Sequence, residues 1–254
     1  MAKKITTERA EIIIENLTKK FEDLTAVDDL SLTISKGELF GLLGPNGAGK
    51  TTTINVLCGL LQPTSGSVTV GGYDVTRNPK KVKALIGVCP QDTAVFPYLT
   101  GKENVEFFGN LHLLSREALA QNVISLLEKM GLSEDADRRV QKYSGGMRRR
   151  VNLAMALVSN PEIAFLDEPT VAMDPQSRRA VWDFIKGLKK EGKTVILTTH
   201  YMEEAEELCD RVGIIDYGNL IALGSPRQLK KDHGAKNLED VFIGLTGRHI
   251  REGI

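Results

Sequence analysis

The apolar residues of this chain gather in short runs of strand length, separated by turns that are rich in glycine. The runs that we interpret as strands are residues 12–14, 30–34, 39–43, 66–72, 85–88, 163–166, 194–197 and 212–215. A helix over residues 176–190 joins two of the later runs, which is the β-α-β rhythm of a parallel sheet. Residues 216–219 predict a hairpin turn into a last strand over residues 220–223.

The pattern becomes helical between about residues 92 and 159. Leu119, Val123, Leu127 and Met130 recur at helical spacing, and Gly131 stands where the glycine that ends a helix belongs. We find no internal repeat and no low-complexity linker. The sequence therefore predicts one α/β domain over residues 10–235, with a helical subdomain inserted at about 92–159, and a C-terminal tail over residues 236–254.

A glycine-rich segment between the strand at 39–43 and a helix at 52–57 fits the phosphate-binding pattern G-x-x-x-x-G-K-[ST]. The segment and the residue after it are Gly44, Pro45, Asn46, Gly47, Ala48, Gly49, Lys50, Thr51 and Thr52. Nucleotide phosphates need backbone N–H donors at close range, and a Cβ at Gly47 or Gly49 would obstruct that approach. Lys50 supplies a positive charge for the β- and γ-phosphates, and the Thr51 hydroxyl can ligate Mg²⁺. A purely structural glycine turn is the alternative.

Two carboxylates follow the buried run at 163–166. Asp167 and Glu168 would lie at the carboxyl edge of the sheet, where α/β proteins place their ligands. Alternation along the strand should send the two side chains to different sides, so that one can hold the metal and the other can act on water. A surface Asp-Glu pair opening a loop before Pro169 is the alternative, which the neighbouring phosphate loop makes less favourable.

Composition excludes several classes of protein. Lys and Arg total 33, and so do Asp and Glu, so no net field would recruit nucleic acid or an acidic membrane surface. The longest apolar runs are far shorter than the ~18 residues that a membrane span needs. Cys58, Cys89 and Cys209 are scattered without a C-x-x-C pair, which suits reduced thiols. We therefore expect a soluble cytoplasmic protein.

These motifs together resemble those of the ATP-binding (ATPase) subunits of ABC transporters. Seven of them occur in the family's order between residues 21 and 200. The segment similar to the family's L-S-G-G-Q signature is Tyr143, Ser144, Gly145, Gly146 and Met147, which departs from it at both ends. The remaining matches are Gln91 for the Q-loop glutamine, Asp174 in the D-loop, His200 for the switch histidine and Phe21 for the aromatic residue that stacks on adenine.

The resemblance implies a fold and a site. The fold would be a P-loop NTPase core of mostly parallel sheet with flanking helices, an antiparallel β subdomain and the inserted α-helical subdomain. Phe21 and the loop from Gly44 to Thr52 would bind ATP, and Thr51, Gln91 and Asp167 would hold Mg²⁺. Glu168, His200 and Gln91 would be the catalytic residues. For Phe21, covering of the sheet is the alternative to stacking on adenine.

Ser144 is a natural helix N-cap, and Gly145 and Gly146 expose N–H groups at the start of the helix that follows, which makes a second anion site. The resemblance implies that a second ATPase subunit supplies this site, so that a homodimer or pseudo-dimer sandwiches two ATP molecules. Arg148, Arg149 and Arg150 come next. We interpret them as a solvated basic face, with a contact to a partner's acidic surface as the alternative; nucleic acid is not expected.

The favoured function is the ATP-hydrolysing motor of an ABC membrane transporter whose transmembrane permease subunits are separate chains. Such a motor lies at the inner face of the cell membrane through the permease. A soluble single-cassette ABC ATPase acting in an assembly process is the alternative, and the set of Asp167, Glu168 and His200 argues against a cassette that only binds ATP. Residues 236–248 and the signature resemble drug-export ATPases of the daunorubicin-resistance type, which favours export. The cargo is chosen by the membrane subunits.

The apolar cluster at residues 96–99 follows Gln91 closely and has two interpretations that we leave open. It can pack between the two subdomains. It can also form a groove that receives a short cytoplasmic helix of a permease through centrally placed aromatic side chains.

Overall fold

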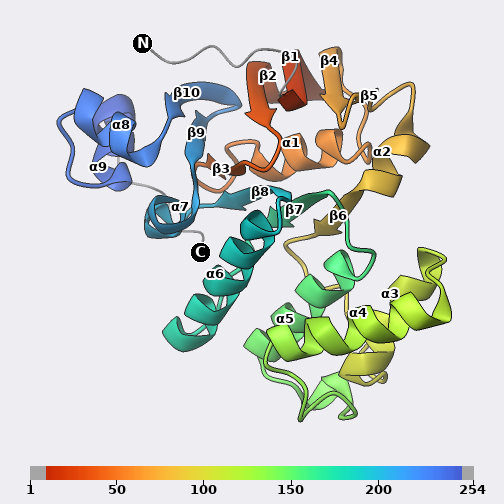
Figure 1. Ribbon diagram of the computed structural model, residues 1–254. Helices are drawn as coiled ribbons and strands as arrows, with labels where there is room; N and C mark the ends of the chain where they lie inside the picture. Colours follow the sequence, from red (N-terminus) through yellow and green to blue (C-terminus); the bar gives the residue numbers. More distant parts are fainter. Residues whose placement is uncertain (1–9, 248–254) are drawn as a thin grey trace.

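The computed structural model describes residues 10–247 and arranges them around two sheets (Figure 1). The larger sheet has the strand order β10-β9-β3-β8-β7-β6. Its strands are β3 (Leu39–Leu43), β6 (Ile86–Cys89), β7 (Ile163–Asp167), β8 (Thr194–Thr199), β9 (Arg211–Asp216) and β10 (Asn219–Gly224). All neighbours pair in parallel except β9 and β10, which form the predicted hairpin. Tyr217 and Gly218 make its turn with φ angles of 46° and 79°.

The smaller sheet is antiparallel, with the order β2-β1-β4-β5. Its strands are β1 (Ala10–Phe21), β2 (Leu24–Ser35), β4 (Ser65–Val70) and β5 (Tyr73–Asp74). β1 and β2 are much longer than the apolar runs that predicted them, because backbone pairing continues through polar residues as far as Phe21 and Leu24. The two sheets and their helices confirm the α/β fold class with its antiparallel β subdomain.

Helices cover both faces of the larger sheet. α1 (Lys50–Leu57) contacts β2 and β4 of one sheet and β7 of the other, so it lies between them. A helical layer lies to one side of the sheets in Figure 1 and comprises α3 (Gly101–Leu111), α4 (Arg116–Lys129), the short 3₁₀ helix η2 (Val140–Lys142) and α5 (Gly145–Leu157). The other helices are α2 (Pro79–Leu85), α6 (Pro175–Lys190), α7 (Met202–Leu208), α8 (Pro226–Asp232) and α9 (Leu238–Thr246).

Alternation along the central strands divides the apolar interior into two cores. Phe40, Phe165 and Ile196 face the core that α1 and the antiparallel sheet close. Leu39 and Leu197 belong to the other core, which contains side chains of α5, α6 and α7. The central strands β3, β7 and β8 are therefore buried on both faces, whereas β10 at the edge of the sheet is partly exposed.

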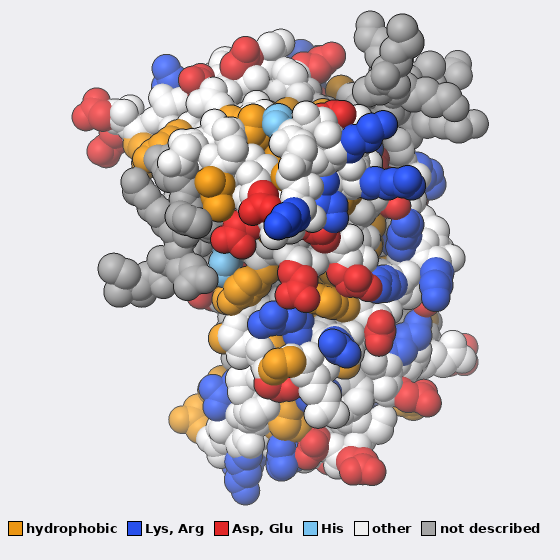
Figure 2. Space-filling model, turned by 90° about the vertical axis from the view of Figure 1, so that its left-hand side faces the viewer, with side chains coloured by type: hydrophobic (Ala, Val, Ile, Leu, Met, Phe, Trp, Pro, Cys, Tyr) orange, Lys and Arg blue, Asp and Glu red, His pale blue; other side chains and the backbone are white. Residues whose placement is uncertain are grey.

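Part of the predicted tail is helical. Leu238, Val241 and Phe242 of α9 are buried, and α9 contacts α7 and α8. Residues 248–254 of that tail lie outside the described residues. Basic and acidic side chains are interspersed over the face shown in Figure 2, in keeping with the balanced charge of the sequence. Within residues 10–247, no helix is long and apolar enough to cross a membrane.

The packing of β6 against α5 makes a testable prediction about Gly87. A Cβ on this buried glycine would lie 2.2 Å from the Ala156 carbonyl oxygen, whereas a Cβ on Gly187 in α6 would meet no described atom within 4 Å. Gly87→Ala should therefore lower the free energy of unfolding by roughly 1–3 kcal/mol through overpacking. Gly187→Ala should raise it by roughly 0.5–1 kcal/mol, because alanine is the better helix former. Denaturant titration measures both, and equal effects at the two positions would contradict this packing.

Candidate functional site

The loop of residues 44–49 connects the carboxyl end of β3 to α1. Gly49 has a φ of 104°, and a Cβ there would lie 2.3 Å from the Ala26 carbonyl oxygen, so the position accepts only glycine. Gly47 has a φ of 81°, and its Cβ position is open, with no described atom within 4 Å. The two glycines are thus required for different reasons: a neighbouring backbone restricts Gly49, while Gly47 leaves its side of the loop accessible.

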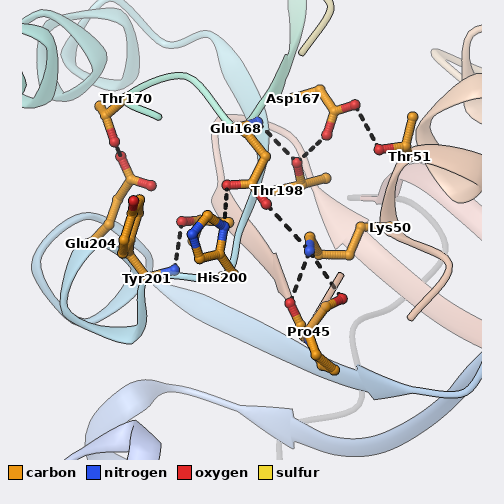
Figure 3. A network of polar contacts seen from close by, with 12 residues as sticks. Pro45, Lys50, Thr51, Asp167, Glu168, Thr170, Thr198, His200, Tyr201 and Glu204 are labelled. Carbon is orange, nitrogen blue, oxygen red and sulfur yellow. Dashed lines mark hydrogen bonds and ion pairs between the residues drawn. The ribbon is translucent and has the colours of Figure 1, made fainter. Parts of the chain in front are cut away.

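Lys50 begins α1 and returns its side chain to the loop. The side chain is 6% exposed, and its ammonium group donates to the carbonyl oxygens of Gly44 at 2.8 Å and Pro45 at 3.3 Å. The same nitrogen lies 3.2 Å from Glu168 Oε1 (Figure 3). The predicted phosphate-binding cation and the predicted base are therefore in direct contact.

Asp167 ends β7 next to two hydroxyl groups. The Thr51 hydroxyl donates to its Oδ2 at 2.8 Å, and the Thr198 hydroxyl of β8 donates to its Oδ1. Asp167 is 3% exposed, and it faces Thr198 in the register of β7 and β8. The loop threonine and the strand aspartate, which the sequence places 116 positions apart, thus come together as predicted.

Glu168 lies beside Asp167 but has different partners. Its φ is 50°, so strand alternation ends at Asp167 and does not place the Glu168 side chain, contrary to our expectation. The left-handed backbone is costly for a residue with a side chain. The Glu168 N–H donates to the carbonyl and hydroxyl oxygens of Thr198, at 3.2 Å and 3.1 Å. These bonds hold the residue in its turn.

His200 follows β8 and completes a chain of polar contacts with Glu168 and Lys50 (Figure 3). Its Nδ1 lies 2.9 Å from Glu168 Oε2. Burial of Glu168 favours its neutral form, but the hydrogen bond from His200 and the charge of Lys50 outweigh it and lower the pKa of Glu168 below the usual 4.5. Glu168 is therefore an ionised carboxylate at neutral pH, which is the form that accepts a proton.

A third carboxyl group, which sequence reasoning missed, lies on the far side of this cluster. Glu204 in α7 is fully buried, and its Oε1 accepts hydrogen bonds from the Thr170 hydroxyl at 2.7 Å and the Trp182 indole at 2.9 Å. Its Oε2 has no hydrogen-bond partner among the described residues. Burial raises the pKa of Glu204 above 4.5, against the lowering effect of its hydrogen bonds.

The phosphate loop opens into a cavity of about 490 Å³, within the size range of small-molecule sites. Phe21, Leu24 and Tyr217 line one part of it, and Gln91 and Glu168 line another. Phe21 is 41% exposed, and the Lys19 ammonium lies 4.8 Å from its ring centre. The structure thus brings Phe21 and Gln91 to the loop, as the sequence predicted.

The signature residues are not part of this cavity. Ser144 is exposed and caps α5 by accepting a hydrogen bond from the Met147 N–H at 3.2 Å. Gly145 beside it is exposed, and Gly146 lies near Ser177 at the start of α6. Asp174, which is also outside the cavity, caps α6 by accepting from the Gln176 and Ser177 N–H groups. The signature glycines therefore lie at an exposed helix N-terminus, apart from the phosphate loop.

One expectation about the signature segment is corrected in part, and the first residue of the segment is buried. The Tyr143 side chain is 3% exposed and donates to the Asp135 carbonyl inside the helical layer, so it cannot contact a nucleotide. Of the three arginines, Arg148 is exposed, as expected for a solvated basic face, but Arg149 is not. Arg148 bonds to the carbonyls of Tyr143 and Gln141, Arg150 bonds to those of Met130 and Gly131, and Arg149 is buried beside the Glu168 turn.

Comparisons with known proteins agree on one family. The family model described as "ABC transporter" matches residues 27–171. The linearmycin resistance ATP-binding protein LnrL of Bacillus subtilis is 45% identical over 238 residues, which are 94% of this chain and 75% of that protein. The daunorubicin resistance ATP-binding protein DrrA3 of Streptomyces coeruleorubidus is 42% identical over 237 residues, which are 93% of this chain and 75% of that protein.

A solved structure gives the same fold. The dimeric ATP-binding cassette MJ0796, in a post-hydrolysis state bound to ADP and Pi, superimposes with a TM-score of 0.77 and 28% identity. The match covers 84% of this chain and 98% of that one.

The burial of Glu204 predicts a pH dependence of stability. Its pKa is higher in the folded chain than in the unfolded chain, so unfolding releases a proton between the two pKa values. The stabilising contribution of the protonated Glu204 carboxyl group is therefore complete below pH 4.5. It is lost as the pH rises through the pKa that Glu204 has in the folded chain. Glu204→Gln removes this titration, so its stability relative to the parent chain should increase from pH 4.5 to pH 8. Denaturant titrations followed by the single tryptophan, Trp182, measure the difference.

Glu207→Gln on the same helix is the matched control. The Lys186 ammonium lowers the pKa of this exposed carboxyl. The stability of Glu207→Gln relative to the parent chain should therefore change little with pH, and in the direction opposite to that of Glu204→Gln. A Glu204→Gln curve parallel to the parent curve would contradict the burial of an ionisable group at this position.

Proposed function

The chain belongs to the ABC transporter family, and we propose that it is the ATP-hydrolysing subunit of an exporter whose membrane-spanning subunits are separate chains. The observation that carries the proposal is the contact of the loop residues Lys50 and Thr51 with Glu168 and Asp167 at one strand edge. Two of its relatives are antibiotic resistance ATP-binding proteins. Export is the transport direction that removes an antibiotic from a cell. The names of these relatives therefore support export as the direction of transport here.

The residues of the loop and the strand edge divide the work on ATP. We propose that Lys50 and the backbone N–H groups of residues 46–52 bind the phosphates, and that Phe21 stacks on the adenine. Glu168 accepts a proton from the water that attacks the γ-phosphate, and His200 holds Glu168 and the phosphate in place. Gln91 orients the water from the other side of the cavity. The products are ADP and phosphate.

The oxygen atoms next to the loop fit a magnesium ion. Thr51 Oγ1 and Asp167 Oδ2 are 2.8 Å apart, and Gln91 lines the same cavity. Mg²⁺ typically uses one or two carboxylates together with substrate phosphates, so it does not need the clusters of three or more acidic, His or Cys residues that residues 10–247 lack. We propose that Thr51, Asp167 and Gln91 hold it, and that it neutralises phosphate charge.

The remote position of the signature supports a site shared by two ATPase subunits. Ser144, Gly145 and Gly146 present a helix N-terminus to solvent. We propose that this end meets the γ-phosphate held by a second copy or a close homologue, with Asp174 in the same interface. Formation of a dimer by the MJ0796 cassette supports the arrangement. Residues 10–235 would form this cassette, with residues 92–159 as its helical subdomain and 236–254 as its tail.

We propose that the permease contacts the helical layer near Gln91 and holds the subunit at the inner face of the membrane. Tyr98 is 75% exposed and Phe96 is 43% exposed, although Phe96 also packs edge-to-face on Phe107 at 5.1 Å. Exposure of Tyr98 supports docking over packing for this side chain. The apolar cluster at residues 96–99 follows Gln91 closely in sequence. A partner bound to this cluster would therefore lie close to the γ-phosphate region.

Glu168→Gln tests the proposed base. The amide keeps the size of the carboxylate and its bond to His200 but cannot accept the proton. We expect kcat for ATP hydrolysis to fall about 10²- to 10⁴-fold while ATP affinity is retained. The variant should form an ATP-dependent dimer, which size-exclusion chromatography detects.

Addition of Ser144→Arg to this variant is the control for the shared site. The arginine should abolish the dimer and leave ATP binding within a few-fold, because Ser144 is remote from the chain's own phosphate loop. Near-normal hydrolysis by Glu168→Gln would exclude Glu168 as the base. An unchanged dimer in the double variant would place the shared site elsewhere.

Tyr98→Ala tests the permease contact. ATP hydrolysis by the isolated subunit should stay within a few-fold, since this side chain lies outside the cavity, while ATP-driven transport by the complete complex in vesicles should fall at least tenfold. Ile124→Ala, an exposed apolar side chain on α4, should leave transport unchanged. If the two variants transport equally, the docking surface lies elsewhere on the subunit.

A further inference from the structure

Arg149 is a buried cation that neither the motifs nor the proposed mechanism explains. Its residue exposure is 2%, and it makes no ion pair with a described carboxylate. Its side chain instead donates to the main-chain carbonyls of Pro90, Gln91, Asp167, Glu168 and Pro169. A guanidinium has five N–H groups, and these bonds occupy all of them.

The five carbonyls belong to the two segments that carry the proposed catalytic groups. Nη1 binds the Pro90 and Gln91 oxygens at 2.6 Å and 2.7 Å, and Nη2 binds those of Asp167 and Glu168. The planar fork of arginine can span both segments at once, whereas a lysine ammonium is a single point of charge. Arg149 therefore fixes the distance between the Gln91 segment and the Glu168 turn.

Glu168 is held on both sides by this arrangement. Thr198 binds its N–H group, and Arg149 binds its carbonyl oxygen at 2.9 Å. A residue with a φ of 50° stays in place only when its surroundings determine it, and these two partners do so. The direction of the Glu168 side chain follows from that backbone.

A second side chain of α5 faces the same segment. Asn152, one turn after Arg149, is buried, accepts from the Ala94 N–H at 3.2 Å and donates to the Pro90 carbonyl at 3.4 Å. The helix that begins at the signature is thus bonded to residues 90–94 at two successive turns.

We infer that Arg149 is a positioning residue that sets the main chain of Gln91 and Glu168 relative to the signature helix. The inference rests on the proposed ATPase function. Contact of a partner with Ser144 would then move or fix α5, and Arg149 would pass that constraint to the proposed base. Arg149 itself is too deeply buried to touch the substrate.

Arg149→Lys and Arg149→Gln test this role, with Arg148→Lys and Arg150→Lys as matched controls. The controls lie on the same helix and bind carbonyls only within the helical layer. We expect kcat to fall roughly 10- to 100-fold in both Arg149 variants, as for other misplaced catalytic groups, with KM for ATP within about threefold. The controls should keep kcat within about threefold.

Amide hydrogen exchange of the folded variants supplies a readout that does not depend on turnover. Exchange should accelerate at residues 91–95 and 168–171 in the Arg149 variants and stay unchanged within α5. An unchanged kcat, or a rise in KM that accounts for the whole loss, would overturn the inference. Failure of both Arg149 variants to fold would also overturn it, because the role of Arg149 would then be structural. Absence of ATP hydrolysis by the parent chain would instead contradict the proposed function.

Discussion

Parallel pairing of β3, β8 and β7 is the constraint on which the whole site depends. Leu43 lies opposite Thr199, and Asp167 lies opposite Thr198, so the three strands end at one edge of the sheet. The phosphate loop, the Asp167–Glu168 pair and His200 each follow one of these ends. A slip in the register of β7 would separate Asp167 from Thr198 and the Glu168 N–H group from its acceptors. The buried residues on both faces of these strands prevent such a slip.

Several ionisable side chains are buried near this edge of the sheet, where an apolar core alone would not stabilise them. Lys50, Asp167, Glu168, Arg149 and Glu204 are all buried, and a buried charge costs free energy unless it is paired and hydrogen-bonded. Lys50 and Glu168 form an ion pair, and Asp167 accepts hydrogen bonds from Thr51 and Thr198. Arg149 donates only to backbone carbonyls, and burial raises the pKa of Glu204. Such groups are fixed before a substrate binds, which suits stabilisation of charge that develops on phosphate.

Local patterns predicted the parts of the site that depend on local chemistry. The glycine spacing of the loop and the apolar run before Asp167 indicated the carboxyl ends of two strands, and the fold confirms those positions. The pairing partners of Arg149 could not be predicted, because three successive arginines look alike in sequence and only the packing of α5 on β6 and β7 distinguishes them. The burial of Tyr143 could not be predicted either, because a consensus position does not reveal which face of the chain turns inward. The conformation of Glu168 is set by Thr198, thirty residues away in sequence.

Rigidity of α5 gives the surface signature a mechanical connection to the buried turn. Arg149 lies five positions after Ser144, the N-cap of α5, which is a rise of about 7.5 Å along the axis. Helix hydrogen bonds and the burial of Leu153 and Val151 make this segment move as a unit. A force at Ser144 therefore reaches the carbonyls of Gln91 and Glu168 without passing through a flexible loop. The cap of α5 lies at the surface while Arg149 is buried beside Glu168, so one helix contacts both places.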